Sequence, residues 1–196
     1  MPHAAIVFTS YPGLVVNDAT DGDIAWTTPT NAQASDDSRT SATLSVPNPN
    51  SQWLVASGFN YLHDGSLMIP DNAVVVGILV VVEGHSAIGA AAWETIRIGA
   101  DVGDWDGDDK AAGVWDTGSD GDHDFGGTVD TWSNSMSLAF IRDSMKVGIR
   151  ANNNAEASVS CRIDSVRVDL YVEQELQPRY RCRSEGTMGR QFRVHT

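Results

Sequence analysis

The 196-residue sequence has few cysteines, few positive charges and no long hydrophobic run. Its two cysteines, Cys161 and Cys182, are too few for a disulfide scaffold and fit either one bridge or two unrelated thiols. The longest apolar run, 73–82, is shorter than the roughly 20 residues of a membrane span and ends at Glu83, so it predicts a buried strand. The first residues lack the basic start and apolar stretch of a signal peptide, and the chain has no Asn-x-Ser/Thr acceptor. Export by the usual route is therefore not expected.

Positive charge is scarce and unevenly placed. Residues 1–172 contain 8 Lys and Arg against 23 Asp and Glu, a net charge of −15, whereas residues 173–196 contain five Arg and three Glu, a net charge of +2. The acidic body disfavours binding to nucleic acid or an anionic membrane. Because guanidinium groups pair with carboxylates as readily as with phosphates, we expect the basic segment to dock on an acidic protein surface. The expected partner-binding residues are Arg179, Tyr180, Arg181, Arg183, Arg190, Phe192 and Arg193.

Alternation with a period of two dominates the chain and is clearest in 166–173, where four apolar side chains share one face. Turn residues such as Asn, Asp, Gly and Pro separate this and similar short segments, and 137–143 is expected to form a short helical connector. The pattern predicts an all-β fold, an antiparallel β-sandwich with extended terminal arms. We expect an N-terminal arm or edge strand over 1–20, a sandwich over 21–173 and a basic C-terminal arm over 174–196. Further strands are predicted at 39–46, 53–62, 74–83, 95–98, 145–150 and 159–163.

Residues 101–130 contain ten aspartates and one lysine. Carboxylates on alternate residues of a loop can converge on a calcium ion, although neither Asp-rich run has the Gly and Glu of an EF-hand loop. The alternatives are a solvated acidic loop, which needs no cofactor, and a calcium site. The candidate ligands are Asp104, Asp106, Asp108, Asp120, Asp122 and Asp124.

Catalytic patterns are missing from the sequence. The five histidines have no metal-ligand spacing, and no nucleophile elbow, P-loop or dinucleotide-binding fingerprint is present. We therefore expect a protein that is not an enzyme. Of the six tryptophans, Trp105 lies in an acidic segment and is the candidate for an exposed, carbohydrate-stacking ring, whereas core packing is expected for the others.

Two separated segments, 24–44 with its Trp-Thr-Thr-Pro-Thr-Asn-Ala core and 125–132 with the sequence Phe-Gly-Gly-Thr-Val-Asp-Thr-Trp, carry a family resemblance. Together with 59–78, 111–115 and 163–171 they resemble a jelly-roll β-sandwich module of tailed-bacteriophage virion proteins. Thr131 stands where related modules often have Leu, and the central loop is more acidic than is usual in them.

This resemblance implies a jelly-roll fold and a virion component made in the bacterial host cytoplasm. The single module and the basic arm favour a capsid decoration or cement protein that clamps neighbouring subunits. Its expected partners are the major capsid protein and copies of itself, in a homo-oligomer that resemblance suggests is a trimer. A tail or neck adaptor and a carbohydrate-binding fibre appendage are the alternatives.

Overall fold

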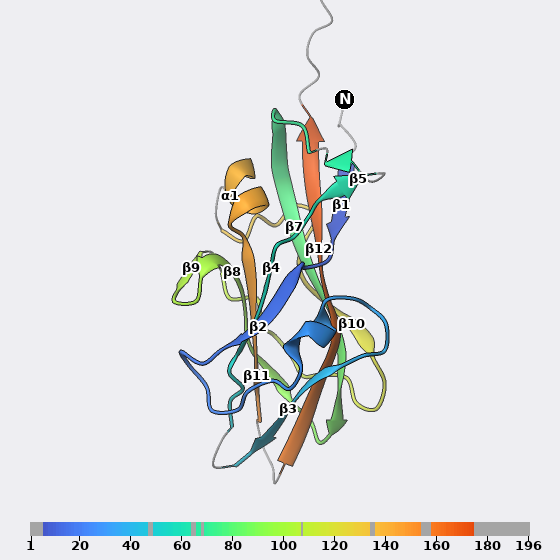
Figure 1. The fold of residues 1–196 in the computed structure, drawn as a ribbon, viewed down its shortest axis with the longest axis vertical. Coiled ribbons are helices and arrows are strands. Elements are labelled where there is room, and N and C mark those ends of the chain that lie inside the picture. The colour runs from blue at the N-terminus through green and yellow to red at the C-terminus, as the bar shows by residue number, and fades with distance from the viewer. Residues whose placement is uncertain are drawn as a thin grey trace, which may run out of the picture.

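The computed structural model describes residues 6–46, 49–63, 66–67, 69–106, 108–133, 136–153 and 158–174. Two antiparallel five-stranded sheets and a two-stranded hairpin make up the fold (Figure 1), which confirms the predicted β-sandwich. The elements are β1 (Ile6–Ser10), β2 (Leu14–Asp18), η1 (Pro29–Ala32), β3 (Thr40–Ser45), β4 (Trp53–Ser57), β5 (Leu62–His63), β6 (Ser66–Leu67), β7 (Ala73–Ile88), β8 (Ala92–Asp101), β9 (Asp104–Asp106), β10 (Gly121–Gly127), α1 (Leu138–Asp143), β11 (Lys146–Asn152) and β12 (Ser158–Gln174).

The first sheet is built around β7 and β12, which run side by side along the molecule (Figure 1). Its strand order is β1-β12-β7-β10, with β3 pairing to the other end of β12. The alternation predicted over 166–173 is confirmed, because Val166, Val168 and Leu170 are fully buried while the residues between them are more exposed. The predicted segments 159–163 and 166–173 form one strand, interrupted by a bulge between Ile163 and Ser165.

The second sheet has the order β2-β4-β11-β8-β9 and supplies the other half of the core. Its inward residues, among them Leu54, Ile96, Ile98 and Ile149, are completely buried against the valines and leucine of the first sheet. The predicted helical connector is α1, whose N-terminus is capped by the Ser137 hydroxyl accepting from the Phe140 N–H at 3.1 Å.

The first residues of the described chain belong to both sheets. β1 pairs with β12 of the same chain, whereas β2 pairs with β4, so each is an edge strand of a different sheet. Of the two alternatives expected for 1–20, an arm or an edge strand, the described residues form edge strands, and Ile6 to Ser10 pair with Val172 to Val168 of the same chain.

The Phe-Gly-Gly-Thr-Val-Asp-Thr-Trp segment is a closed turn built around Trp132. Its indole N–H donates to the Ile78 carbonyl at 3.0 Å, and its backbone N–H donates to the Asp130 carboxylate at 2.8 Å. Gly126 has a φ of 90°, and a Cβ there would lie 2.6 Å from Nε1 of Trp132 and overlap the Ile78 carbonyl. This glycine therefore permits the close contact between the turn and β7.

We predict that Gly126→Ala lowers the free energy of unfolding by roughly 2–4 kcal/mol, because the new methyl group meets both backbone strain and overlap. Gly127→Ala is the matched control, since a Cβ at Gly127 meets nothing within 4 Å. Urea denaturation of the two variants measures the difference. Equal stability of the two proteins would show that the turn does not depend on this contact.

Candidate functional site

Exposed apolar side chains recur along β1, β2 and the turn between them, where the chain crosses from one sheet to the other. Among the described residues, ten large hydrophobic side chains are exposed, and five of them fall within this short stretch. Edge strands that carry exposed apolar side chains are templates for association. We call these residues the β1–β2 apolar side: Ile6, Val7, Tyr11, Leu14 and Val16.

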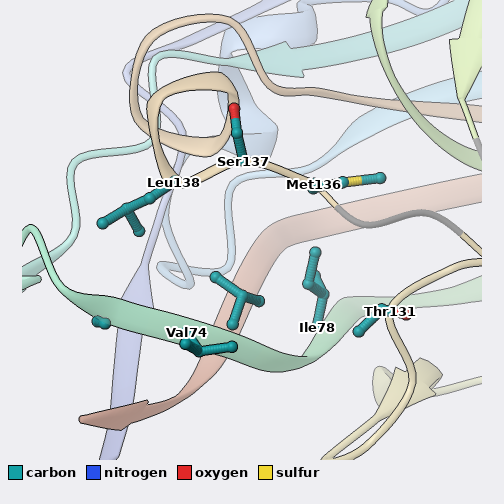
Figure 2. A pocket seen from close by; sticks show the side chains of 8 residues that line it. Val74, Ile78, Thr131, Met136, Ser137 and Leu138 are labelled. Carbon is teal, nitrogen blue, oxygen red and sulfur yellow. The ribbon is translucent and has the colours of Figure 1, made fainter. Parts of the chain in front are cut away.

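A second feature is an apolar pocket between the start of β7 and the start of α1. Its volume is about 260 Å³, and Figure 2 shows Ile78 of β7 and Leu138 of α1 on opposite sides of it, with Thr131 at one end. The Ser137 hydroxyl caps α1. Because this bond engages the Ser137 hydroxyl, the lining presents mainly apolar groups. The lining residues are Ala73, Val74, Val75, Ile78, Thr131, Met136, Ser137 and Leu138.

Trp105 is half-buried rather than free, so the expectation of an exposed ring on a loop is wrong. It belongs to β9, and its ring packs against Trp53 of β4 with centroids 4.9 Å apart. A side chain at Gly148 of β11 would overlap the ring, so the absence of one there makes room for it on the outer face of the second sheet. Its Nε1 is buried and has no hydrogen-bond partner within the described part of the chain.

Four of the six aspartates proposed as calcium ligands are divided between the two sheets. Asp104 and Asp106 lie on β9 of the second sheet, whereas Asp122 and Asp124 lie on the exposed face of β10 in the first. Most of this acidic segment was expected to be a loop, and two strands form in it instead. In the ranges that the structure describes, no three His, Cys, Asp or Glu side chains are grouped to hold a metal ion.

The remaining two aspartates are engaged by cations. Asp108 pairs with Lys110 at 3.1 Å and accepts from the Ser133 hydroxyl. Lys110 also pairs with Asp130 at 2.9 Å and lies over the Trp132 ring, so it fastens this acidic segment to the turn described above. These contacts hold the acidic segment in place on the turn.

Asp120 is at the centre of a largely buried polar cluster. It accepts from the Arg39 Nε at 2.8 Å, and its other oxygen lies 2.6 Å from Nδ1 of His85. Burial alone would raise the pKa of Asp120, but the hydrogen bonds and charges of Arg39 and His85 outweigh it and hold the pKa below its usual range. Nearby Asp164, in the bulge of β12, is 2% exposed, and burial raises its pKa. The cluster ties the loop before β3 to β7 and to the start of β10.

The seven residues of the expected basic arm, Arg179 to Arg193, lie outside the described residues, as does Cys182. Its possible partner Cys161 is a free thiol in the core, and burial raises its pKa to about 12. The thiol of Cys161 is therefore protonated at neutral pH and is not a nucleophile. Within the described ranges, no helix is long and apolar enough to cross a membrane.

Comparisons with known proteins give little further information. No family model matches the chain, and no curated protein matches it. A solved structure similar to it is the carbohydrate-binding module TmCBM61 in complex with β-1,4-galactotriose, with 11% sequence identity over 83% of this chain and 88% of that one. The TM-score is 0.36, too low to support an inference about this chain.

We predict that Asp120→Asn lowers the free energy of unfolding at pH 7 by roughly 2–4 kcal/mol, because it leaves His85 without its carboxylate and Arg39 with only that of the exposed Asp37. Since the folded-state pKa of Asp120 is lowered, its contribution is fully present above the unfolded pKa of about 3.9 and is lost as the pH falls through the folded value. Asp122→Asn, on the exposed face of β10, is the control. Denaturation curves between pH 2 and pH 7 should show a steeper acid loss for the wild type and the control than for Asp120→Asn; parallel curves for all three would contradict this.

Proposed function

We propose that this chain is a non-enzymatic structural protein of a tailed-bacteriophage virion, of the capsid decoration or cement type, that associates with neighbouring subunits through the β1–β2 apolar side. The observation that carries the proposal is the concentration of exposed apolar residues on edge strands of both sheets. The resemblance of 24–44 and 125–132 to phage sandwich modules supports it. The proposed partners are the major capsid protein and further copies of this chain.

The free energy that such a surface contributes per contact is compatible with binding to a particle built from repeated subunits. Complete burial of one aliphatic side chain contributes about 1.5–3 kcal/mol, and Leu14 and Val16 are 50% and 39% exposed in the isolated chain. One contact of this size gives weak association between two molecules. On a lattice, where each subunit meets several neighbours at high effective concentration, weak contacts add to stable binding without any new chemistry.

The net charge of the chain indicates which classes of partner are compatible with it. The sequence carries a net charge of −13, and Asp122 and Asp124 lie on the exposed face of β10. A body of this charge repels phosphate backbones and favours basic protein surfaces. Protein partners are therefore more compatible with this chain than nucleic acid or an anionic membrane.

Carbohydrate binding is the second candidate, and the observation in its favour is the ring pair of Trp105 and Trp53 on the outer face of the second sheet. Arg150 lies beside them, with its guanidinium carbon 5.3 Å from the centre of the Trp53 ring. An aromatic pair next to a cation on a sheet surface could stack against a sugar. Because Trp53 is only 6% exposed, Trp105 would provide most of that contact.

The assembly proposal predicts concentration-dependent self-association that the double variant Leu14→Glu, Val16→Glu reduces at least tenfold, because two carboxylates then enter the apolar contact. Sedimentation velocity over a range of protein concentrations measures it. Val129→Glu is the matched control, since Val129 is 84% exposed and lies away from β1 and β2. A wild type that stays monomeric at every concentration, or a control that dissociates as readily as the double variant, would contradict this surface.

The two candidate functions give opposite results on a glycan array. A structural protein of the proposed kind binds no sugar, with or without a calcium chelator. Sugar binding that Trp105→Ala abolishes, while Trp105→Phe retains part of it, would establish the carbohydrate-binding alternative. Loss of such binding in chelator would in addition assign a role to calcium.

A further inference from the structure

Asp164 is a carboxyl group that the fold encloses without a full set of partners. It occupies the bulge of β12 between Ile163 and Ser165 and is only 2% exposed. Its Oδ1 has no hydrogen-bond partner among the described residues. An ionised carboxylate in such a place loses its hydration without a replacement, whereas the protonated acid costs far less to bury. The enclosure of Asp164 therefore favours its neutral form.

The charges around Asp164 favour the same form. Burial is the main cause that raises the pKa of Asp164, and the like charges of Glu83 on β7 and Asp120 before β10 raise it further. The charge of Arg39 and the backbone of Asp37, both in the loop before β3, lower the pKa but do not cancel these effects. An added proton thus relieves repulsion between acidic groups from three parts of the chain.

The cations beside this group are already engaged by Asp120. The Arg39 Nε donates to the Asp120 carboxylate at 2.8 Å, and Nδ1 of His85 lies 2.6 Å from the other oxygen of the same carboxylate. An ionised Asp164 competes with Asp120 for Arg39, and it adds a third negative charge beside Asp120 and Glu83. Loss of the proton from Asp164 therefore weakens the contact between Arg39 and Asp120.

The bulge that contains Asp164 is also where the loop 33–39 meets β12. Gln33, at the start of the loop, forms a β-bridge with Ser165, and Arg39, at its end, is bonded to Asp120. Residues 34–38 between them are exposed, and Asp37 among them pairs with Arg39 at 3.1 Å. A change of charge at Asp164 thus acts beside the contacts that attach both ends of the loop.

We propose that Asp164 keeps its proton in the folded chain at pH values at which exposed aspartates are ionised, and that loss of this proton at higher pH loosens the attachment of the loop 33–39 to β12 and Asp120. The cluster is then a proton-sensitive attachment, tight in acid and looser as the pH rises. This inference is independent of the proposed function, because it concerns an interior group and requires no partner.

Nuclear magnetic resonance measures the proton directly. The side-chain carboxyl carbons of the labelled full-length protein are followed between pH 3 and pH 9. We expect the titration midpoint of Asp164 to lie above that of Asp124, which is exposed on β10. A midpoint for Asp164 at or below that of Asp124 would overturn the proposal.

Asp164→Asn gives a second test, because it keeps the shape of the side chain and cannot ionise. The stability that a raised folded-state pKa confers is fully present below the unfolded value of about 3.9 and is lost as the pH rises through the folded value. The unfolding equilibrium constant of the wild type, divided by that of Asp164→Asn, should therefore rise at least threefold between pH 4 and pH 8. The same ratio for the control Asp124→Asn should stay within twofold. A ratio for Asp164→Asn that is constant or falls contradicts the proposal.

Trypsin tests the attachment itself, since cleavage after Arg39 requires its guanidinium group to leave Asp120. Mass spectrometry identifies this cut, and a free peptide with the sequence of 35–44 corrects for the pH dependence of the protease. The corrected rate should be at least threefold higher at pH 8 than at pH 5 in the wild type, and it should change less than twofold in Asp164→Asn. A wild-type rate that does not depend on pH, or an equal rise in both proteins, shows that Asp164 does not control the loop.

Discussion

The pairing of β7 with β12 is the interaction on which the rest of the fold depends. The ladder extends from Ala73 opposite Gln174 to Ile88 opposite Ser160, and every other strand of the first sheet pairs with one of these two. Three register shifts interrupt it and let two long strands twist without losing their partners. One shift contains Asp164, which is buried beside the Arg39, His85 and Asp120 cluster, so the bulge also supplies a polar attachment point for the loop before β3.

The two segments that carry the family resemblance are attached to this ladder and to the core beside it by their tryptophans. Trp26 donates its indole N–H to the Gln52 carbonyl at 2.9 Å, and Trp132 does the same to Ile78. Both rings are fully buried, and Trp26 packs on Trp115 with centroids 6.3 Å apart. The tryptophans and aspartates of these segments therefore close turns onto strands. Of the ten exposed large apolar side chains among the described residues, five lie elsewhere, along β1, β2 and the turn between them, whereas Val129 belongs to the 125–132 segment.

Sequence reasoning succeeded where local pattern and tertiary environment agree. The alternation in 166–173 predicted a half-buried strand, and 137–143 was predicted to be a short helical connector; both are present. It failed for β10, because Gly, Asp and His are poor strand formers and the segment becomes a strand by pairing with β7. Trp105 was misplaced for a related reason, since the glycine that makes room for it lies more than 40 positions away at 148. The pocket unites two distant stretches of chain, 73–78 and 131–138, which no sequence pattern predicts.

The position of β1 has a consequence for how the protein folds during synthesis. β1 leaves the ribosome well before its partner β12, and the Thr9 hydroxyl donates to the Asp169 carboxylate across 160 residues. The first sheet cannot close on β1 until β12 has been translated, and such long-range contacts make folding slow. Until then Ile6 and Val7 remain without their strand partner, so chaperone binding to the nascent chain has a defined early target.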